Sequence, residues 1–278
     1  MTHQKVDLVL TFLQSHPDFA AGLIEEWSIE DAAAFIKSIP LPEASLVLGH
    51  MLPHYTARIC MALEPGTAAG FLSHMDNRVI AAVLRYTNKT SLRNLLKELP
   101  VKTRTTCKLL LNYAEDTAGA WMLPQTAAVP IGCTVEEALK RLAEEQDTVV
   151  TDVVCVVDRE NQMRGVTGIS TLLRTKPEIP IELMMRKNPD TISGHSALSS
   201  VQQHDGWICH DTLPVVNRSK QMIGMLRHMD MRNGMRQTSS TIPQSKTNTP
   251  LTEIFEVYGG SLLALFSTLG GLSNRKSQ

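Results

Sequence analysis

Five side chains that could bind a metal lie within eight consecutive positions, and they are His204, Asp205, Cys209, His210 and Asp211. Zinc needs four such ligands that converge as a tetrahedron. Here the ligands are spread over an expected helix end, a Gly206-Trp207 turn and the approach to a strand, so their side chains need not point together. We therefore interpret this segment as a loop without a metal. No nucleophile, base and orienting group are readable at a catalytic spacing, so we predict that the chain is not an enzyme.

The length, net charge and cysteine spacing of the chain limit the classes of protein to which it can belong. A chain of 278 residues can form two or three compact units. Its 27 basic and 28 acidic residues give a net charge of -1, which argues against a nucleic-acid partner. The five cysteines form no C-x-x-C pair, as expected for reduced thiols inside a cell. The N-terminus is too polar for a signal peptide, so we expect a cytoplasmic protein.

Prolines and capping residues recur every 11 or 12 residues in the first half of the chain, at Pro42, Pro53, Pro65, Asn77, Asn88 and Pro100. Proline is tolerated at the first position of a helix and asparagine can cap one, so each interval predicts one short helix and a turn. Apolar residues at helical spacing fill each interval. Helices this short are unstable alone and must stack on their neighbours, which predicts an α-solenoid. Two helices, Val6–Ser15 and one around Phe19–Trp27, are expected before it.

The second half contains one pattern twice. In the first copy, strand 127–130 precedes a helix over 135–144, where Thr134 and Glu137 form a capping box. Strands 153–157 and 163–166 and a helix around 170–173 follow. The second copy has a strand at 190–192, a helix from Ala197 to about His204, strands 213–216 and 222–226, and a helix starting near Met229. This is a tandem β-α-β-β-α repeat.

The segment Asn112–Met122, NYAEDTAGAWM, joins the two halves. Glu115, Asp116 and Thr117 can cap a helix start, and the small residues 118–120 allow another backbone to pack closely. The segment resembles the Tyr-Pro-Glu-Asp-(Ser/Thr)-Ala-Gly…Met junction of the MgtE magnesium-channel family, with Ala114 in place of the proline. The resemblance implies a superhelical N domain joined to a pair of CBS domains, which often dimerise, so a homodimer through the CBS pair is expected.

CBS domains of this kind bind adenosine nucleotides such as ATP or AMP in clefts between their two halves. The family's ribose-contacting signature is Gly-x-x-(Ser/Thr)-x-x-Asp. On the first copy it falls on Gly165, Gly168 and Thr171, so both the hydroxyl and the carboxylate positions are changed. On the second copy the carboxylate survives, and the resemblance implies a site made by Pro214, Val215, Gly224, Arg227 and Asp230. Arg227 could bind a phosphate, or could pair with Asp230 and close the site.

The resemblance also implies magnesium sensing, because MgtE cytosolic domains bind Mg²⁺ through carboxylates that face each other between domains. Mg²⁺ prefers such oxygen ligands. The candidate ligands are Glu115, Asp116, Asp205 and Asp211, and Asp147 and Asp152 are further acidic candidates.

The tail divides into a polar stretch, residues 236–250, and an apolar-faced segment, residues 251–278. The first is expected to be a flexible linker. The second carries apolar residues at helical spacing, which predicts an amphipathic helix. Its apolar run is too short to span a membrane. We expect this helix to dock on protein, on a membrane transporter or on a membrane surface.

The predicted fold class is therefore an α plus α/β multidomain chain. Its expected parts are residues 1–28 as leading helices, 29–121 as an MgtE-N-like α-solenoid, 122–182 and 183–235 as two CBS domains, 236–250 as a linker and 251–278 as a C-terminal helix. We expect a regulatory or sensory protein that resembles the cytosolic gate of a magnesium channel without its membrane domain. The alternative is a non-enzymatic scaffold subunit that binds a transporter or another protein through its solenoid and C-terminal helix.

Overall fold

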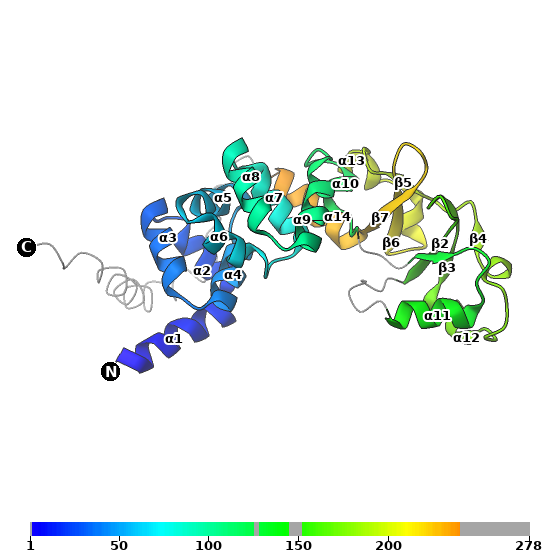
Figure 1. Ribbon diagram of the computed structural model, residues 1–278, viewed down its shortest axis with the longest axis horizontal. Helices are drawn as coiled ribbons and strands as arrows, with labels where there is room; N and C mark the ends of the chain where they lie inside the picture. The colour runs from blue at the N-terminus through cyan, green and yellow to red at the C-terminus, as the bar shows by residue number, and fades with distance from the viewer. Residues whose placement is uncertain (1, 125–127, 145–151, 240–278) are drawn as a thin grey trace, which may run out of the picture. The chain divides into compact units, whose positions relative to one another are not determined.

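The computed structural model describes residues 2–124, 128–144 and 152–239 (Figure 1). These residues form two compact units, which divide between Cys107 and Lys108. The first unit is entirely helical, and the second contains the strands. The predicted fold class, a helical N-terminal region followed by a CBS-like α/β region, is confirmed.

The helices of the first unit are short and follow one another at the spacing of the prolines and caps. They are α1 Thr2–Ser15, α2 Pro17–Ile24, α3 Ile29–Ser38, α4 Leu41–His50, α5 Pro53–Ala62, α6 Pro65–Leu72, α7 Asn77–Arg85, α8 Lys89–Glu98 and α9 Val101–Leu111, the last of which continues across the division between the units. Pro53 and Pro65 occupy the first turn of their helices, and the Asn88 side chain caps α8 by accepting from the Ser91 amide. The cap of α7 is Asp76 rather than Asn77, because the Asp76 carboxylate accepts from the Arg78 amide.

In the first unit, the helices from α2 to α6 each pack against the helix two positions further along the chain. Such contacts join α2 to α4, α3 to α5, α4 to α6, α5 to α7 and α6 to α8. Fully buried side chains such as Ile36, Leu48 and Ile59 fill the interior that these contacts enclose. This arrangement is the predicted α-solenoid, in which short helices gain stability from their neighbours.

The second unit contains the junction helix α10 Ala118–Trp121 and two copies of the repeat. The first copy comprises β1 Ala128–Pro130, α11 Val135–Glu144, β2 Val153–Val157, β3 Met163–Gly168 and α12 Ile169–Arg174. After the short helix η1 Ile181–Leu183 and the strand β4 Arg186–Lys187, the second copy comprises β5 Ile192–Ser193, α13 Leu198–Val201, η2 Asp205–Ile208, β6 Thr212–Val216, β7 Met222–Arg227 and α14 His228–Ser239.

The two copies have equivalent sheets. One sheet has the strand order β1-β2-β3-β4 and the other β5-β6-β7, and in both the first pair is parallel and the second antiparallel. The Thr134–Glu137 capping box is confirmed, since the Glu137 carboxylate accepts from the Thr134 amide at 2.9 Å and the Thr134 hydroxyl accepts from the Glu137 amide at 3.3 Å.

The segment before each copy completes the sheet of the other copy. β4 precedes the second copy but pairs with β3 of the first, where Arg186 lies opposite Val166. Leu123 precedes the first copy but exchanges two backbone hydrogen bonds with Met225 of β7, at 2.6 and 2.9 Å. Gln221 of the second copy also bridges to Gln162 of the first. The copies therefore share their sheet edges.

The two sheets also share an apolar core. Val153, Cys155 and Val166 of the first copy pack with Met222 and Met225 of the second. The opposite face of the first sheet packs on the helices of its own copy. β2 is thus buried on both faces, which explains why it is apolar throughout, and every residue of β6 is likewise buried.

Three local predictions differ from the structure, and one strand was not predicted at all. The helix expected from Ala197 to about His204 is the single turn α13, followed by η2. The Thr117 hydroxyl does not cap α10, because it donates to the carbonyl of Ala114 instead. β4 is not predicted by the sequence pattern. α14 continues to Ser239, into the segment expected to be a linker.

Within the described ranges, no helix has the length and apolar character needed to cross a membrane. The predicted amphipathic helix at 251–278 lies outside the described residues, as does the remainder of the predicted linker.

Candidate functional site

A cavity of about 360 Å³ opens between the two copies of the repeat, a size within the range of small-molecule sites. It is lined by Val153, Val166, Thr167, Gly168, Thr171, Met184, Arg186, Cys209 and His210.

Three parts of the second unit position these side chains. The end of β3 and the first turns of α12 bring Gly168 and Thr171 of the first copy to the cavity. Arg186 reaches it because β4 pairs with β3. Cys209 and His210 come from the second copy, directly after η2. A molecule bound in the cavity would therefore touch both copies and the segment that joins them.

The polar groups of the cavity are cationic or neutral. Arg186 brings a guanidinium that is half-exposed and lies 3.2 Å from the Asp190 carboxylate. His210 adds an imidazole, and Thr171 adds a hydroxyl. Among the lining residues in the described part of the chain, none is acidic. The cavity is consequently better suited to an anion with an apolar portion than to a metal cation.

Thr167 also lines the cavity, but its hydroxyl group does not open onto it. The residue is only 4% exposed, and its hydroxyl oxygen has no hydrogen-bond partner in the described structure. A buried hydroxyl without a partner is costly, and in native proteins it calls for a specific explanation. Its oxygen is itself covered by protein on the face of β3 that packs on the helices of the first copy, so a molecule in the cavity would not supply one.

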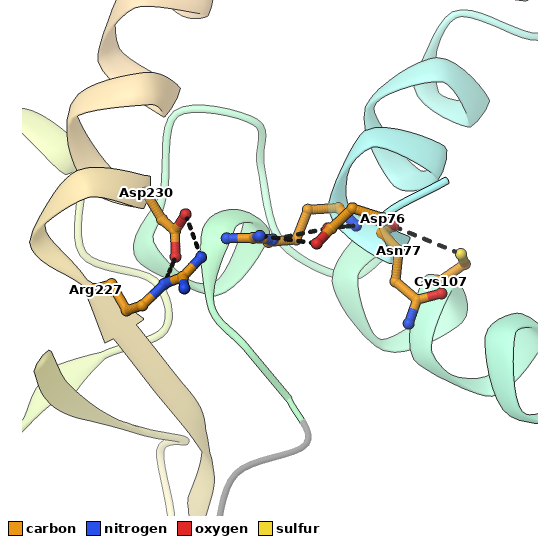
Figure 2. Close-up of polar contacts among 6 residues, drawn as sticks. Asp76, Asn77, Cys107, Arg227 and Asp230 are labelled. Carbon is orange, nitrogen blue, oxygen red and sulfur yellow. Dashed lines mark hydrogen bonds and ion pairs between the residues drawn. The ribbon is translucent and has the colours of Figure 1, made fainter. Parts of the chain in front are cut away.

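The equivalent place in the second copy is occupied by an ion pair. β3 and β7 have the same length and register, so Arg227 corresponds to Gly168 and Asp230 corresponds to Thr171. The Arg227 guanidinium donates to both Asp230 oxygens, through Nε at 2.6 Å and through Nη2 at 3.1 Å (Figure 2). Asp230 is 4% exposed. Of the two arrangements left open by the sequence, the structure has the one in which arginine pairs with the surviving aspartate.

The other residues predicted for a second-copy nucleotide site are covered by protein. Pro214 and Val215 are buried on β6. A Cβ atom at Gly224 would lie 2.5 Å from the Leu123 carbonyl oxygen, so the junction backbone already occupies the space above this glycine. None of these three residues lines the cavity.

The predicted magnesium ligands lie in separate structural contexts within the second unit. Glu115 and Asp116 belong to the junction, where the Asp116 carbonyl accepts from the Leu198 amide. Asp205 begins η2, and Asp211 directly precedes β6. In the ranges that the structure describes, no three His, Cys, Asp or Glu side chains form a group that could hold a metal ion. Asp147 lies outside those ranges.

The ligand-rich loop at residues 204–211 has structural uses for some of its side chains. His204 Nδ1 accepts a hydrogen bond from the Gly206 amide at 3.0 Å and so caps η2. The Trp207 indole nitrogen donates to the Val201 carbonyl at 2.7 Å. Only Cys209 and His210 of this loop line the cavity.

The cysteines fall into two chemical classes. Burial raises the pKa of Cys60, Cys107 and Cys155 to about 12, and burial also raises the pKa of Cys133. The Cys107 thiol lies 3.7 Å from the Asn77 carbonyl oxygen within the first unit (Figure 2). These four thiols stay protonated at neutral pH and are inert. Cys209 is exposed.

The cavity was not predicted from the sequence, because the aspartate of the ribose-contacting signature is present only in the second copy and the nucleotide site was therefore expected there. The informative difference was steric. Gly168 has no side chain, whereas the second copy has the long Arg227 at the corresponding position. A glycine paired with a threonine leaves open space in the first copy, and an arginine paired with an aspartate fills it in the second.

Comparison with known proteins gives one matching family model, the MgtE intracellular N domain, over residues 15–116. The magnesium transporter MgtE of Thermus thermophilus is 26% identical over 221 residues, which cover 76% of this chain and 48% of that protein. The chain spans about half the length of the curated relatives that it matches.

Two solved structures share the fold over most of the chain. The cytosolic domain of the Mg²⁺ channel MgtE in complex with ATP has a TM-score of 0.69 at 24% identity, covering 81% of this chain and 92% of that one. The soluble part of a magnesium transporter has a TM-score of 0.61 at 19% identity, covering 86% of this chain and all of that one (100%). Residues 15–116 therefore match the MgtE intracellular N domain, and the chain is similar in sequence to MgtE magnesium transporters and shares the fold of their cytosolic region.

Proposed function

We propose that this chain is a regulatory module of the MgtE type that binds an adenine nucleotide, ATP or AMP, in the cavity between its two CBS copies. The observation that carries the proposal is the cavity itself, with the Arg186 and His210 side chains in its wall. The similar MgtE cytosolic domain has been solved in complex with ATP, which supports the same ligand class for this chain.

The lining of the cavity matches the two ends of a nucleotide. Val153, Val166 and Met184 offer apolar surface for a planar base. Arg186 offers positive charge for phosphate oxygens, and His210 offers an imidazole that can form hydrogen bonds with them. The bound nucleotide would contact both copies and stabilise their arrangement. The stability of the CBS pair would then depend on the cellular concentration of the nucleotide.

Calorimetric titration of the full chain with ATP and AMP, each with and without Mg²⁺, tests this proposal. We expect one nucleotide per chain, and thermal unfolding at about 100 times the dissociation constant should show about 2.7 kcal/mol of added stability. Gly168→Leu fills the cavity and should weaken binding by about tenfold or more. A Cβ at Gly168 has no neighbour closer than 3.5 Å, so this variant is expected to fold.

The matched control is Asp230→Ala, which removes the signature carboxylate of the second copy without touching the cavity lining. It should bind nucleotide with wild-type affinity. Binding lost in Asp230→Ala but kept in Gly168→Leu would move the site to Arg227 and Asp230. If the wild type binds no nucleotide, the scaffold function is favoured. If Mg²⁺ alone raises the unfolding temperature, a magnesium site at Glu115, Asp116, Asp205 or Asp211 is favoured.

A second part of the proposal is that two chains associate through the CBS pair. The short helices of this unit expose large apolar side chains, with Leu173 68%, Leu183 79%, Ile208 83% and Met229 58% exposed. Exposed apolar side chains of this size are typical of protein–protein contacts when they gather on one surface. We infer a homodimer as the state that covers them.

A further inference from the structure

Arg186 is a charged side chain of the cavity wall, and strand pairing fixes the face of the sheet on which it lies. It is opposite Val166 in the β3–β4 pair, and side chains that oppose each other across paired strands lie on the same face. Val153 and Val166 pack toward the second copy on that face. His210 reaches the cavity from the second copy. A cation, an imidazole and apolar surface therefore meet on one side of the sheet.

Thr171 contributes a neutral hydroxyl group to the same wall. Its hydroxyl oxygen would lie 3.5 Å from a Cβ atom at Gly168, so it is next to the space that this glycine leaves open. Thr171 is exposed, whereas the Thr167 hydroxyl is covered by protein. Among the lining residues in the described part of the chain, none carries a carboxylate. The wall beside Gly168 thus offers a neutral polar contact without a charged acceptor.

The sugar of a ribonucleotide carries a 2′-hydroxyl group that a deoxyribonucleotide lacks. Proteins can recognise this group with an Asp or Glu carboxylate, which accepts its hydrogen bond. A site rejects the analogue that lacks a hydroxyl group when the loss leaves a buried protein group unpaired. The exposed Thr171 hydroxyl can bond to water instead, so the missing group costs the complex little.

We propose that the cavity binds adenine nucleotides without distinguishing ribose from 2′-deoxyribose, and that Thr171 is the residue that determines this specificity. The inference rests on the proposed function and specifies its ligand class, which includes both ATP and dATP. The phosphates lie against Arg186 and His210, the base lies on the apolar residues of the wall, and the sugar lies beside Thr171. Affinity then comes from the phosphates and the base, and the 2′-hydroxyl group contributes little.

The first test compares ATP with dATP on the full chain, by calorimetric titration at one fixed Mg²⁺ concentration. We expect the two dissociation constants to agree within about threefold, because the described wall presents no carboxylate to the 2′-hydroxyl group. Arg186→Gln should weaken both nucleotides by the same factor, about tenfold, since it removes the guanidinium and keeps the backbone pairing of β4 with β3. A loss confined to one of the two nucleotides would overturn the inference.

The second test introduces a carboxylate beside the sugar. Thr171→Asp should bind ATP about tenfold more tightly than dATP, because a charge-assisted hydrogen bond then depends on the 2′-hydroxyl group. Position 171 is exposed, so this variant is expected to fold, and circular dichroism checks that it does.

The matched control is Ser170→Asp. It adds the same charge one residue earlier in α12, at an exposed residue that is not among the residues lining the cavity. It should keep the similar affinities of the wild type for ATP and dATP. A preference for ATP that appears in Thr171→Asp and not in this control supports the inference, and the same preference in both variants would overturn it.

The remaining outcomes separate this inference from the proposed function. If the wild type binds ATP about tenfold or more tightly than dATP, the inference fails and the nucleotide function stands. If Thr171→Asp binds the two nucleotides equally, or binds neither, the sugar does not lie at this position and the inference fails. If the wild type binds neither nucleotide, the proposed function fails and the inference fails with it.

Discussion

Gly165 and Gly224 occupy equivalent positions in the two copies, and each is covered by the backbone that leads into the other copy. A Cβ atom at Gly165 would lie 2.9 Å from the Arg186 carbonyl oxygen, and one at Gly224 would lie 2.5 Å from the Leu123 carbonyl oxygen. Both glycines are therefore needed because a main chain passes directly over them, not because their own backbone is unusual.

Gly224→Ala should destabilise the second unit by about 1–3 kcal/mol, because the added methyl group pushes the Leu123 backbone away from β7. The two hydrogen bonds between Leu123 and Met225 would lengthen. Thermal unfolding followed by circular dichroism measures the loss as a lower midpoint.

The control for this substitution is Gly22→Ala in α2, where a Cβ would meet no atom within 4 Å. It should raise stability by about 0.5–1 kcal/mol, since alanine favours a helix over glycine. An unfolding midpoint for Gly224→Ala at or above that of the wild type would show that Leu123 is not held against β7 in solution.

Asp230→Ala should lower stability while leaving nucleotide binding intact. The carboxylate is buried and accepts two hydrogen bonds from Arg227, so its removal loses a charge-assisted pair and should cost about 1–3 kcal/mol. Chemical denaturation gives this difference, and the same protein sample serves the ATP titration. Unchanged stability would mean that the pair contributes little beyond filling space.

Asp158 should make stability sensitive to acid. The Gln162 amide donates to this carboxylate, as do the Arg164 side chain and the Glu160 amide, and these interactions lower the pKa of Asp158. A lowered pKa stabilises the fold above the unfolded pKa, about 4, and this contribution is lost as pH falls through the folded pKa.

Asp158→Asn should therefore unfold at a lower temperature than the wild type at pH 7, and the gap should narrow below about pH 4. Glu160→Gln, an exposed change in the same turn, serves as the control and should track the wild type at both pH values. A gap for Asp158→Asn that stays constant from pH 7 to pH 3 would contradict the assignment.

Ile208→Glu should convert a dimer to a monomer if the exposed apolar side chains of the CBS pair are the contact. Ile208 is 83% exposed, so a charge there costs little in the single chain but is unfavourable in an apolar interface. Light scattering after size exclusion measures the mass. Leu8→Glu in α1, at a side chain 56% exposed, is the control and should keep the wild-type mass. A wild type that elutes with the mass of one chain rules out the dimer.

Much of the fold follows from local sequence signals. The prolines and Asn88 mark helix starts in the solenoid, the Thr134–Glu137 box marks α11, and the apolar runs of β2 and β6 stand out because both faces are buried. Each signal acts over a few residues, where propensity and capping decide the conformation.

The features that escaped prediction depend on contacts between distant segments. β4 has two residues and no apolar period, and it is a strand because β3 presents an open edge to it. The cavity likewise depends on the absence of a side chain at Gly168 together with residues about 40 positions away, at Cys209 and His210. The pattern of residues within a short segment does not predict contacts between segments so far apart in sequence.

The exchange of sheet edges between the copies has a consequence for synthesis on the ribosome. The edge of β3 in the first copy can pair only after Arg186 and Lys187 have left the ribosome. The backbone of Leu123 can pair only after Met225, roughly 100 residues later, has been synthesised. The solenoid has no such dependence, because each of its helices packs on close neighbours in sequence. The nascent chain should thus acquire its helical half while still being made, and the two repeats should fold together only once nearly all of the second has left the exit tunnel.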